Sequence, residues 1–137
     1  MDFKKLAKYL TERFGAKKLL YYAGVDDENK KQLRFYEKLQ EFGYTPRLIP
    51  VKRFQDGHKK ADVDSRMTFE MMLYFDEYDE AIIFTGDGDY YWVLEYLLVK
   101  KNKIRLFGSG KSIARELKQL FKGNITDINL LKGILKL

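Results

Sequence analysis

The chain has 137 residues, 45% of them hydrophobic and 15% aromatic, which fits one globular domain with a buried core and excludes a disordered chain. The absence of cysteine excludes a disulfide framework, a thiolate metal site and a cysteine nucleophile, and without a membrane-length apolar run or a signal-peptide core the expected location is the cytoplasm. A formal net charge of +6 favours an acidic partner, most commonly nucleic acid, although scattered surface lysines can also serve solubility alone.

Two helices and two strands are predicted in the first fifty residues. Apolar side chains at helical spacing predict helices over Asp2–Phe14 and from Leu33 to Phe42, each ended by a glycine. A strand-like run follows each helix, at Lys18–Ala23 and at Tyr44–Ile49. Because Pro46 has no N–H to donate to a neighbouring strand, the second of these strands is expected at a sheet edge.

Strands and helices continue to alternate in the rest of the chain. The predicted segments are a basic loop at Pro50–Lys60, a helix at Asp62–Tyr74, a strand around Ile82, a helix to about Lys101, a strand at Ile104–Phe107, a helix at Ser112–Phe121, and a short extended piece with a terminal helix within Ile125–Leu137. This alternation predicts a single α/β domain over residues 1–137, with helices on both faces of a largely parallel sheet of about four strands.

The most informative stretch runs from Ala81 to Trp92. An apolar run of strand length stops at Thr85, and two aspartates follow two residues apart, Asp87 and Asp89, each preceded by a glycine. Open α/β sheets bind ligands where parallel strands end, and glycines allow a tight turn and close approach of a ligand. Paired carboxylates at such a place are suited to a hard divalent cation, Mg²⁺ or Mn²⁺.

Ordinary structural roles compete with this interpretation. Asp89 is placed to be the N-cap of the following helix, and Asp87 could belong to the turn alone. A calcium-binding EF-hand loop is excluded because, counted from Asp87, its required glycine falls on Trp92 and its closing glutamate on Leu98.

Other motifs carry weaker signals. The segment from Gly108 to Ser112 looks like a phosphate-binding P-loop, but Arg105 stands where that motif needs a glycine, so a turn with Ser112 as helix cap is expected instead. His58, the single histidine, lies in the basic loop and is expected to be an exposed surface residue.

A basic loop runs into an acidic helix start at Lys59-Lys60-Ala61-Asp62-Val63-Asp64. Asp62 as a cap, with Asp64 in the first turn, is an ordinary arrangement at a helix N-terminus. The functional alternative places Asp64 beside the Asp87 turn and the two lysines beside phosphate.

Several of these stretches together resemble the NYN domain, a branch of the PIN-like ribonuclease superfamily that includes the LabA-like bacterial proteins. The segment Thr85–Tyr90 resembles the family's Ser-Gly-Asp-Ser-Asp-Phe signature, and Lys60–Asp64 resembles the basic, then Val-Asp, entry to its central helix. Further similarities lie at Tyr21-Tyr22, at Phe42-Gly43-Tyr44, in the late pattern of Ser112, Leu117 and Phe121, and at Glu70, where the family often has an aspartate.

The resemblance implies a Rossmann-like, three-layer fold and a metal-dependent ribonuclease. Asp87 would bind the Mg²⁺ or Mn²⁺ ion, and Asp64 and Asp89 would complete the acidic cluster. The expected RNA contacts are Lys59, Lys60, Arg66 and Thr85. Glu70 has a minor role, because six residues of helix place it roughly 120° around the axis from Asp64.

The family's first strand, which ends in a metal-binding aspartate, has no counterpart in this sequence. Either the chain is truncated, or it has lost this strand, or another chain supplies it. The expected assembly is a monomer or a homodimer. The resemblance places this strand between those containing Tyr21-Tyr22 and Ile82-Ile83, so we expect these two strands either to pair directly, which we favour, or to accept a strand from another molecule. Two alternatives to an active nuclease stay open: a catalytically impaired RNA- or protein-binding module, and a purely structural fragment.

Overall fold

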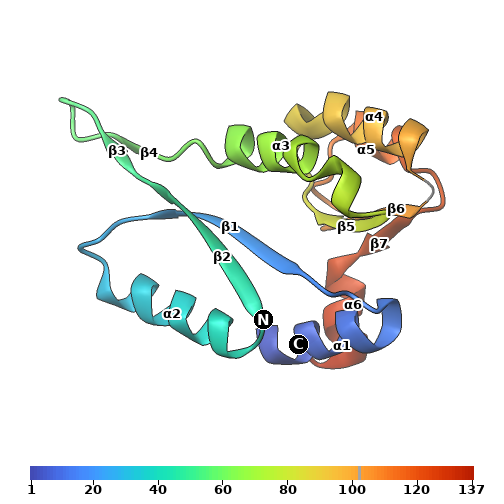
Figure 1. The fold of residues 1–137 in the computed structure, drawn as a ribbon, viewed down its shortest axis with the longest axis horizontal. Coiled ribbons are helices and arrows are strands. Elements are labelled where there is room, and N and C mark those ends of the chain that lie inside the picture. The colour runs from blue at the N-terminus through green and yellow to red at the C-terminus, as the bar shows by residue number, and fades with distance from the viewer. Residues whose placement is uncertain (102) are drawn as a thin grey trace. The chain divides into compact units, whose positions relative to one another are not determined.

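In a computed structural model, residues 1–101 and 103–137 are described, and they form two compact units. The first unit comprises Met1–Met67 together with Leu137, and the second comprises Thr68–Lys136. Both units combine helices with parallel strands, which confirms the predicted α/β class (Figure 1). None of the helices in the described residues has the length and apolar character needed to cross a membrane.

The first unit is a parallel strand pair with its own helices. Its elements are α1 (Phe3–Phe14), β1 (Leu19–Val25), α2 (Lys30–Glu41), β2 (Tyr44–Pro50), β3 (Lys52–Arg53), β4 (Lys59–Lys60) and the first turns of α3 (Val63–Leu73). Asp2 caps α1 by accepting the N–H of Lys5, and Gly15 ends it in the left-handed conformation that favours glycine (φ 67°). The two predicted helices of this region are therefore present, with polar caps at their N-termini.

Aromatic side chains form the core of the first unit. Tyr36 and Tyr44 are buried beside Ala7 and Leu39, and Phe3 and Tyr21 are among the side chains that pack against them. Both buried hydroxyls donate to backbone carbonyls: Tyr36 to Gly24 over 2.9 Å, and Tyr44 to Phe3 over 2.8 Å. These bonds satisfy the polar ends of the rings and tie helices to strands.

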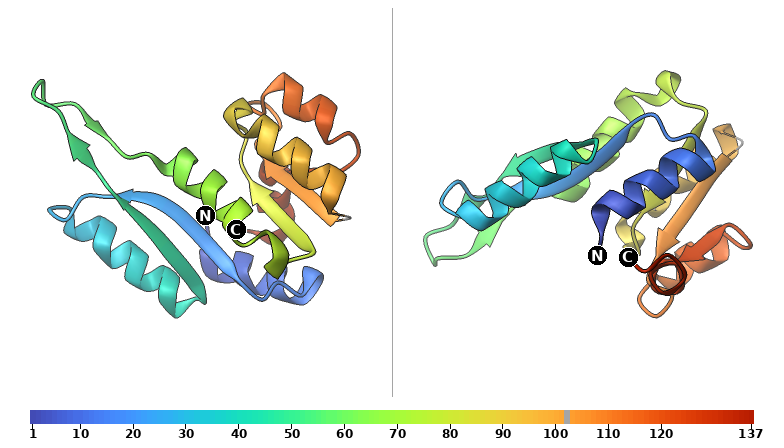
Figure 2. Two further views of the ribbon diagram at one scale, coloured as in Figure 1. Left: turned by 45° about the horizontal axis from the view of Figure 1, so that its top comes forward. Right: turned by 90° about the horizontal axis from the view of Figure 1, so that it is seen from below.

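The second unit is a three-stranded parallel sheet with helices. Its elements are the rest of α3, the 3₁₀ turns η1 (Phe75–Glu77) and η2 (Gly88–Tyr90), β5 (Glu80–Phe84), α4 (Tyr91–Lys100), β6 (Lys103–Gly108), α5 (Arg115–Leu120), β7 (Ile125–Asp127) and α6 (Ile128–Leu135). The strands follow the order β5-β6-β7, and Figure 2 shows them from two further sides. Its most deeply buried side chains are Leu94, Leu97, Leu106, Phe107, Leu117 and Phe121. The strand–helix alternation predicted here is confirmed, including the extended piece and helix at the C-terminal end.

Strand pairing differs from one expectation. β1 pairs with β2, and β5 pairs with β6, in separate sheets, so the favoured direct pairing of the strands with Tyr21-Tyr22 and Ile82-Ile83 is wrong for the residues the structure describes. Each sheet has its own helices and its own buried side chains instead. Pro46 does lie in an edge strand, because β2 has β1 as its one partner within the described ranges.

The expected basic loop at Pro50–Lys60 contains a small hairpin. β3 and β4 pair antiparallel, with Lys52 opposite Lys60, and Gly57 takes a positive φ of 84° in the turn. Two-residue strands with polar side chains carry no alternating pattern, so the sequence could not indicate them. His58 is exposed, as predicted, and its ring lies 5.6 Å from that of Phe54, centroid to centroid.

Candidate metal centre

The acidic turn, residues Thr85–Tyr90, follows directly after β5. Thr85 still donates its N–H to the carbonyl of Phe107 in β6, so the turn starts at the carboxyl end of two parallel strands. Gly86 accepts the N–H of Ala114 over 2.9 Å, which ties the turn to the segment before α5. The predicted location of the aspartates, at the end of a parallel strand, is therefore confirmed.

Asp87 is held by two hydrogen bonds inside the turn. Its backbone N–H donates to Oγ1 of Thr85 over 3.1 Å, and its Oδ1 accepts the N–H of Asp89 over 2.9 Å. Asp87 is thus the N-cap of η2, and Tyr90, without a side-chain cap, is the N-cap of α4. The expectation that Asp89 caps the helix is wrong, because a 3₁₀ turn intervenes and places the cap two residues earlier.

The two glycines of the acidic turn pack closely against neighbouring parts of the second unit. A Cβ added to Gly86 would come within 3.2 Å of the carbonyl oxygen of Ser112, and one added to Gly88 would overlap the carboxylate of Glu116. Protein atoms therefore occupy the space beside these glycines, where the sequence predicted room for a ligand. Glu116 is an acidic neighbour of the turn that the sequence did not single out, because nothing distinguishes it from other helical glutamates.

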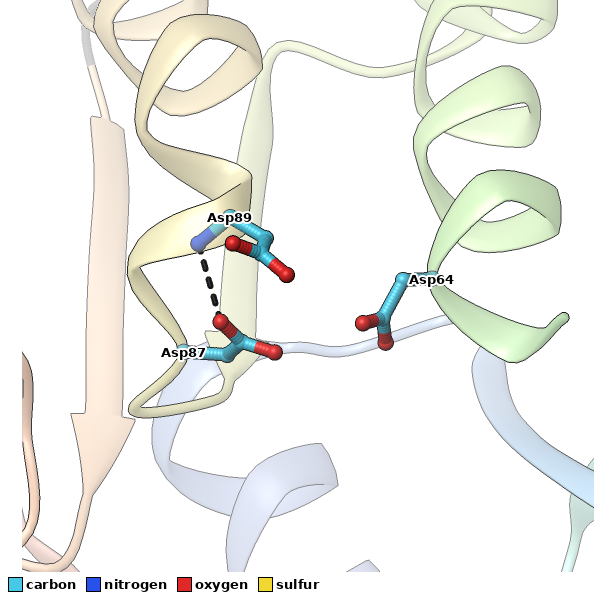
Figure 3. A group of neighbouring side chains, drawn as sticks. All are labelled: Asp64, Asp87 and Asp89. Atoms are coloured by element: carbon cyan, nitrogen blue, oxygen red, sulfur yellow. Dashed lines mark hydrogen bonds between the residues drawn. The ribbon is translucent and has the colours of Figure 1, made fainter.

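Asp64 joins the two aspartates of the turn. It is exposed in the first turn of α3, a helix that continues without a break into the second unit. Asp64, Asp87 and Asp89 each offer one carboxylate oxygen, and these three atoms all lie within 4.8 Å of one another (Figure 3). We call these three residues the acidic cluster.

Glu70 lies outside the acidic cluster. It is 2% exposed, whereas all three aspartates are exposed. The helical geometry that separates Glu70 from Asp64 accounts for this difference. Glu70 is therefore not a member of the acidic cluster, although it lies on the same helix as Asp64.

The cations expected to contact RNA are in different situations. Lys59 forms an ion pair with Asp26 over 3.0 Å, and Arg53 binds the same carboxylate over 2.9 Å. The hydrogen bond from Lys59, more than the other contacts, lowers the pKa of Asp26 below its ordinary value. Lys60 and Arg66 are exposed, in β4 and in the first turns of α3.

The segment that looked like a P-loop is a turn. The N–H groups of Ser112 and Ile113 both donate to the carbonyl of Ser109, and Gly110 packs against the carboxylate of Asp127. α5 begins later than predicted, with Ala114 as its N-cap and no side-chain cap, so the assignment of Ser112 as cap is wrong. Ala114, whose N–H donates to the carbonyl of Gly86, still has a non-helical ψ of 139°.

Comparison with known proteins identifies the family. The model of the NYN domain matches residues 1–129. The chain belongs to the NYN domain family. This confirms the resemblance seen in the acidic turn and in the entry to α3, and with it a PIN-like fold and a PIN-like ribonuclease family.

One relative is similar to this chain in sequence, and one solved structure is similar to it in fold. The "Low amplitude and bright protein LabA" of Synechococcus elongatus is 33% identical over 104 residues, covering 72% of this chain and 55% of that protein. The chain thus spans about half the length of that NYN relative. The crystal structure of a protein of unknown function, VPA0982 from Vibrio parahaemolyticus, matches with a TM-score of 0.74 at 22% identity, over 93% of this chain and 78% of that one. At that identity the second match shows the shared fold alone.

Proposed function

We propose that this NYN domain is a metal-dependent ribonuclease that cleaves RNA phosphodiester bonds at the acidic cluster. The observation that carries the proposal is the convergence of three exposed carboxylates, with one oxygen of each within 4.8 Å of the others. The family supplies the substrate class, because NYN domains form a PIN-like ribonuclease family. We also propose that both units act together as one domain, since the family match runs across the boundary at Met67–Thr68.

The acidic cluster fits a small, hard divalent cation. Octahedral Mg²⁺ holds its oxygen ligands at about 2.0–2.1 Å, which places neighbouring ligands roughly 3 Å and opposite ones roughly 4 Å apart. Exposed aspartates can close the remaining gap by side-chain rotation. Oδ1 of Asp87 already accepts the N–H of Asp89, which leaves Oδ2 as the oxygen that this residue would give to an ion. Mg²⁺ and Mn²⁺ both prefer such carboxylate oxygens.

When bound, such an ion lowers the pKa of a coordinated water and neutralises charge that develops on the scissile phosphate. The chain's own contribution is orientation. The Thr85 hydroxyl accepts the Asp87 N–H, and the Asp89 N–H holds one carboxylate oxygen, so the free oxygen of Asp87 points in a defined direction. Asp64 and Asp89 complete the ligand set from α3 and from η2.

The proposed contacts with RNA phosphates come from basic side chains of β4 and α3 and from the Thr85 hydroxyl. Lys60 and Arg66 are proposed to bind the RNA backbone, and Lys59 joins them only by giving up its ion pair with Asp26. The Thr85 hydroxyl, which accepts one hydrogen bond, retains its own hydrogen for a phosphate oxygen. Backbone contacts of this kind make RNA binding strongly dependent on salt. The cytoplasmic location remains a prediction from the sequence.

The test is cleavage of a single-stranded RNA with Mn²⁺ by the parent and by Asp87→Asn. Asparagine caps a helix about as well as aspartate, so this variant keeps the bond to the Asp89 N–H and loses the charge. We expect a loss of activity of at least about 100-fold in the variant, comparable to other single losses of transition-state charge stabilisation, and an EDTA-sensitive parent.

Asp127→Asn is the matched control. Asp127 caps α6 by accepting the N–H of Asn129 over 2.9 Å, which is the same bond that Asp87 makes two residues ahead. This variant is expected to cleave at the parent rate. Equal, EDTA-insensitive rates in the parent and in Asp87→Asn would contradict the assignment and favour a non-catalytic binding module.

A further inference from the structure

Helix α4 is apolar on two opposite faces. One face is buried in the second unit, through Val93, Leu94 and Leu97. The other carries Trp92, Tyr96 and Val99, spaced four and three residues apart, with Trp92 77% and Val99 75% exposed. We call these three residues the α4 stripe. A helix normally buries one apolar face and exposes a polar one, so the second apolar face of α4 has the composition of a covered surface.

Charged side chains border the α4 stripe without interrupting it. The only charged residues of α4 are Glu95 and Lys100, one of each sign. Glu95 accepts the hydroxyl of Tyr91 over 2.9 Å, and this bond raises the pKa of Tyr91 above its ordinary value. Lys100 lies over the ring of Tyr96, 5.8 Å from its centroid. An apolar strip with a polar rim is the usual arrangement of a protein–protein interface.

A second group of exposed apolar side chains lies on α3 within the same unit. Phe69, Met72 and Leu73 point away from the buried side of the helix. The C-terminal end of α3 lies near the α4 stripe, because Phe75, two residues after Leu73, has its ring centroid 5.8 Å from that of Tyr96. The two groups together comprise six exposed apolar side chains.

We propose that the α4 stripe, with the apolar side chains of α3, is the interface of a homodimer. At about 100 Å² for each side chain, the six expose about 600 Å², so a symmetric pair would bury about 1,200 Å² in total. That area reaches the lower end of stable interfaces. The two charged residues of α4, Glu95 and Lys100, lie at the edges of the stripe, so its three apolar side chains can be covered without burying a charge.

A two-fold axis perpendicular to α4 gives a simple packing. An antiparallel pair of α4 helices centred between Glu95 and Tyr96 sets each Trp92 against Val99 of the second copy. Two-fold dimers are the commonest oligomers, because one self-complementary patch suffices. RNA is a poorer occupant of this face, since nucleic-acid surfaces need clustered cations and α4 offers one lysine.

The first experiment measures mass by sedimentation velocity and light scattering over about 1–200 µM of the full chain. We expect a monomer–dimer equilibrium in the parent and at least a tenfold weaker dimer in Trp92→Arg and in Val99→Glu. Leu130→Arg is the control, because Leu130 is an exposed apolar residue of α6 outside the proposed interface, 68% exposed. Asp87→Asn should associate like the parent, which separates this proposal from the proposed metal chemistry.

The second experiment uses Trp92 as a built-in reporter, since it is the single tryptophan of the sequence. On concentration its fluorescence should shift to the blue and become less accessible to iodide, and Val99→Glu should suppress both changes. A parent that stays monomeric with unchanged fluorescence would overturn the proposal, and so would a dimer that persists in both stripe variants. Quenching of Trp92 in a monomer by polyuridylate would also overturn it and identify the stripe as a base-stacking surface.

Discussion

Tyr44 allows a quantitative test of the core of the first unit. Its ring is 8% exposed, and its hydroxyl donates to the carbonyl of Phe3 over 2.8 Å, which ties α1 to β2. Substitution Tyr44→Phe removes this hydrogen bond and keeps the ring. At pH 7 we expect the free energy of unfolding to fall by about 1 kcal/mol, the usual net value of one buried hydrogen bond.

The same substitution should have the opposite effect in strong alkali. Burial, and to a smaller extent the charge of Asp2, raises the pKa of Tyr44 from 10.0 to about 12. Because the folded pKa lies above the unfolded one, its stabilising contribution is complete below about pH 10 and is lost as the pH rises toward 12. The full shift of two units corresponds to about 2.7 kcal/mol. We therefore expect Tyr44→Phe to become more stable than the parent above roughly pH 11.

The assay for Tyr44 is urea unfolding of both proteins between pH 7 and pH 11.5, followed by circular dichroism. The comparison between parent and variant cancels the ionisation of all other side chains. A difference in stability that keeps the same sign over the whole range would refute the argument. So would a parent and variant of equal stability at pH 7, because the hydrogen bond would then contribute nothing.

Three further predictions concern packing, charge and metal binding. Gly108→Ala should destabilise the protein by about 1–3 kcal/mol, because its Cβ would lie 2.7 Å from the Thr85 carbonyl oxygen. Gly133→Ala, in helix α6 with nothing within 4 Å of the added Cβ, should stabilise it by about 0.5–1 kcal/mol, and equal urea midpoints of the two variants would contradict this. The lowered pKa of Asp26 means that its pair with Lys59 stabilises the fold above pH 3.8, the ordinary pKa, and that this effect is lost as the pH falls through the folded value. Asp26→Asn should therefore be less stable than the parent at pH 7 and equally stable in acid. A difference in stability that does not change with pH would argue against the pair. Mn²⁺ at a hundred times its dissociation constant should raise the free energy of unfolding by about 2.7 kcal/mol, reversibly with EDTA, while a binding module without a metal site would show no change in melting temperature.

Local elements were predictable because their signals lie within a few residues of the sequence. The apolar stripe of α1 and the glycine after it define a helix and its end. The hairpin of β3 and β4 was not predictable, since strands of two lysine or arginine residues have no pattern to detect. The division of the strands between two sheets was missed for another reason: strand pairing depends on contacts distant in the sequence.

Caps were predicted less well than helices. Asp89 and Ser112 have the right chemistry for N-caps, but a cap is defined by where the backbone changes to helical angles. At the acidic turn Asp87 still has an extended ψ of 121°, and η2 starts there. Before α5, the bond from Ala114 to Gly86 delays the helix. The first correction depends on the backbone angles of the turn, and the second on a tertiary contact, and a single sequence displays neither.

The candidate site was predictable in part from local signals. Asp87 and Asp89 follow a strand and are preceded by glycines, so their location at the end of the sheet could be inferred from residue types alone. Asp64 is 23 residues before Asp87, so its place beside the acidic turn was only one of two interpretations of the residues, and the family resemblance favoured it. The neighbour Glu116 was missed because its proximity to Gly88 arises from the packing of α5 against the acidic turn.

Asp87 combines a structural and a proposed chemical role, and the two use different oxygens. Oδ1 accepts the Asp89 N–H and thereby fixes the turn, so an alanine at this position would lose a cap worth about 1 kcal/mol as well as the charge. A loss of cleavage in Asp87→Ala could therefore come from a displaced turn. Asp87→Asn retains an acceptor for the cap, so its loss of activity would be due to charge. Because this hydrogen bond orients the carboxylate and leaves Oδ2 for an ion, the capping role of Asp87 is compatible with the proposed metal site.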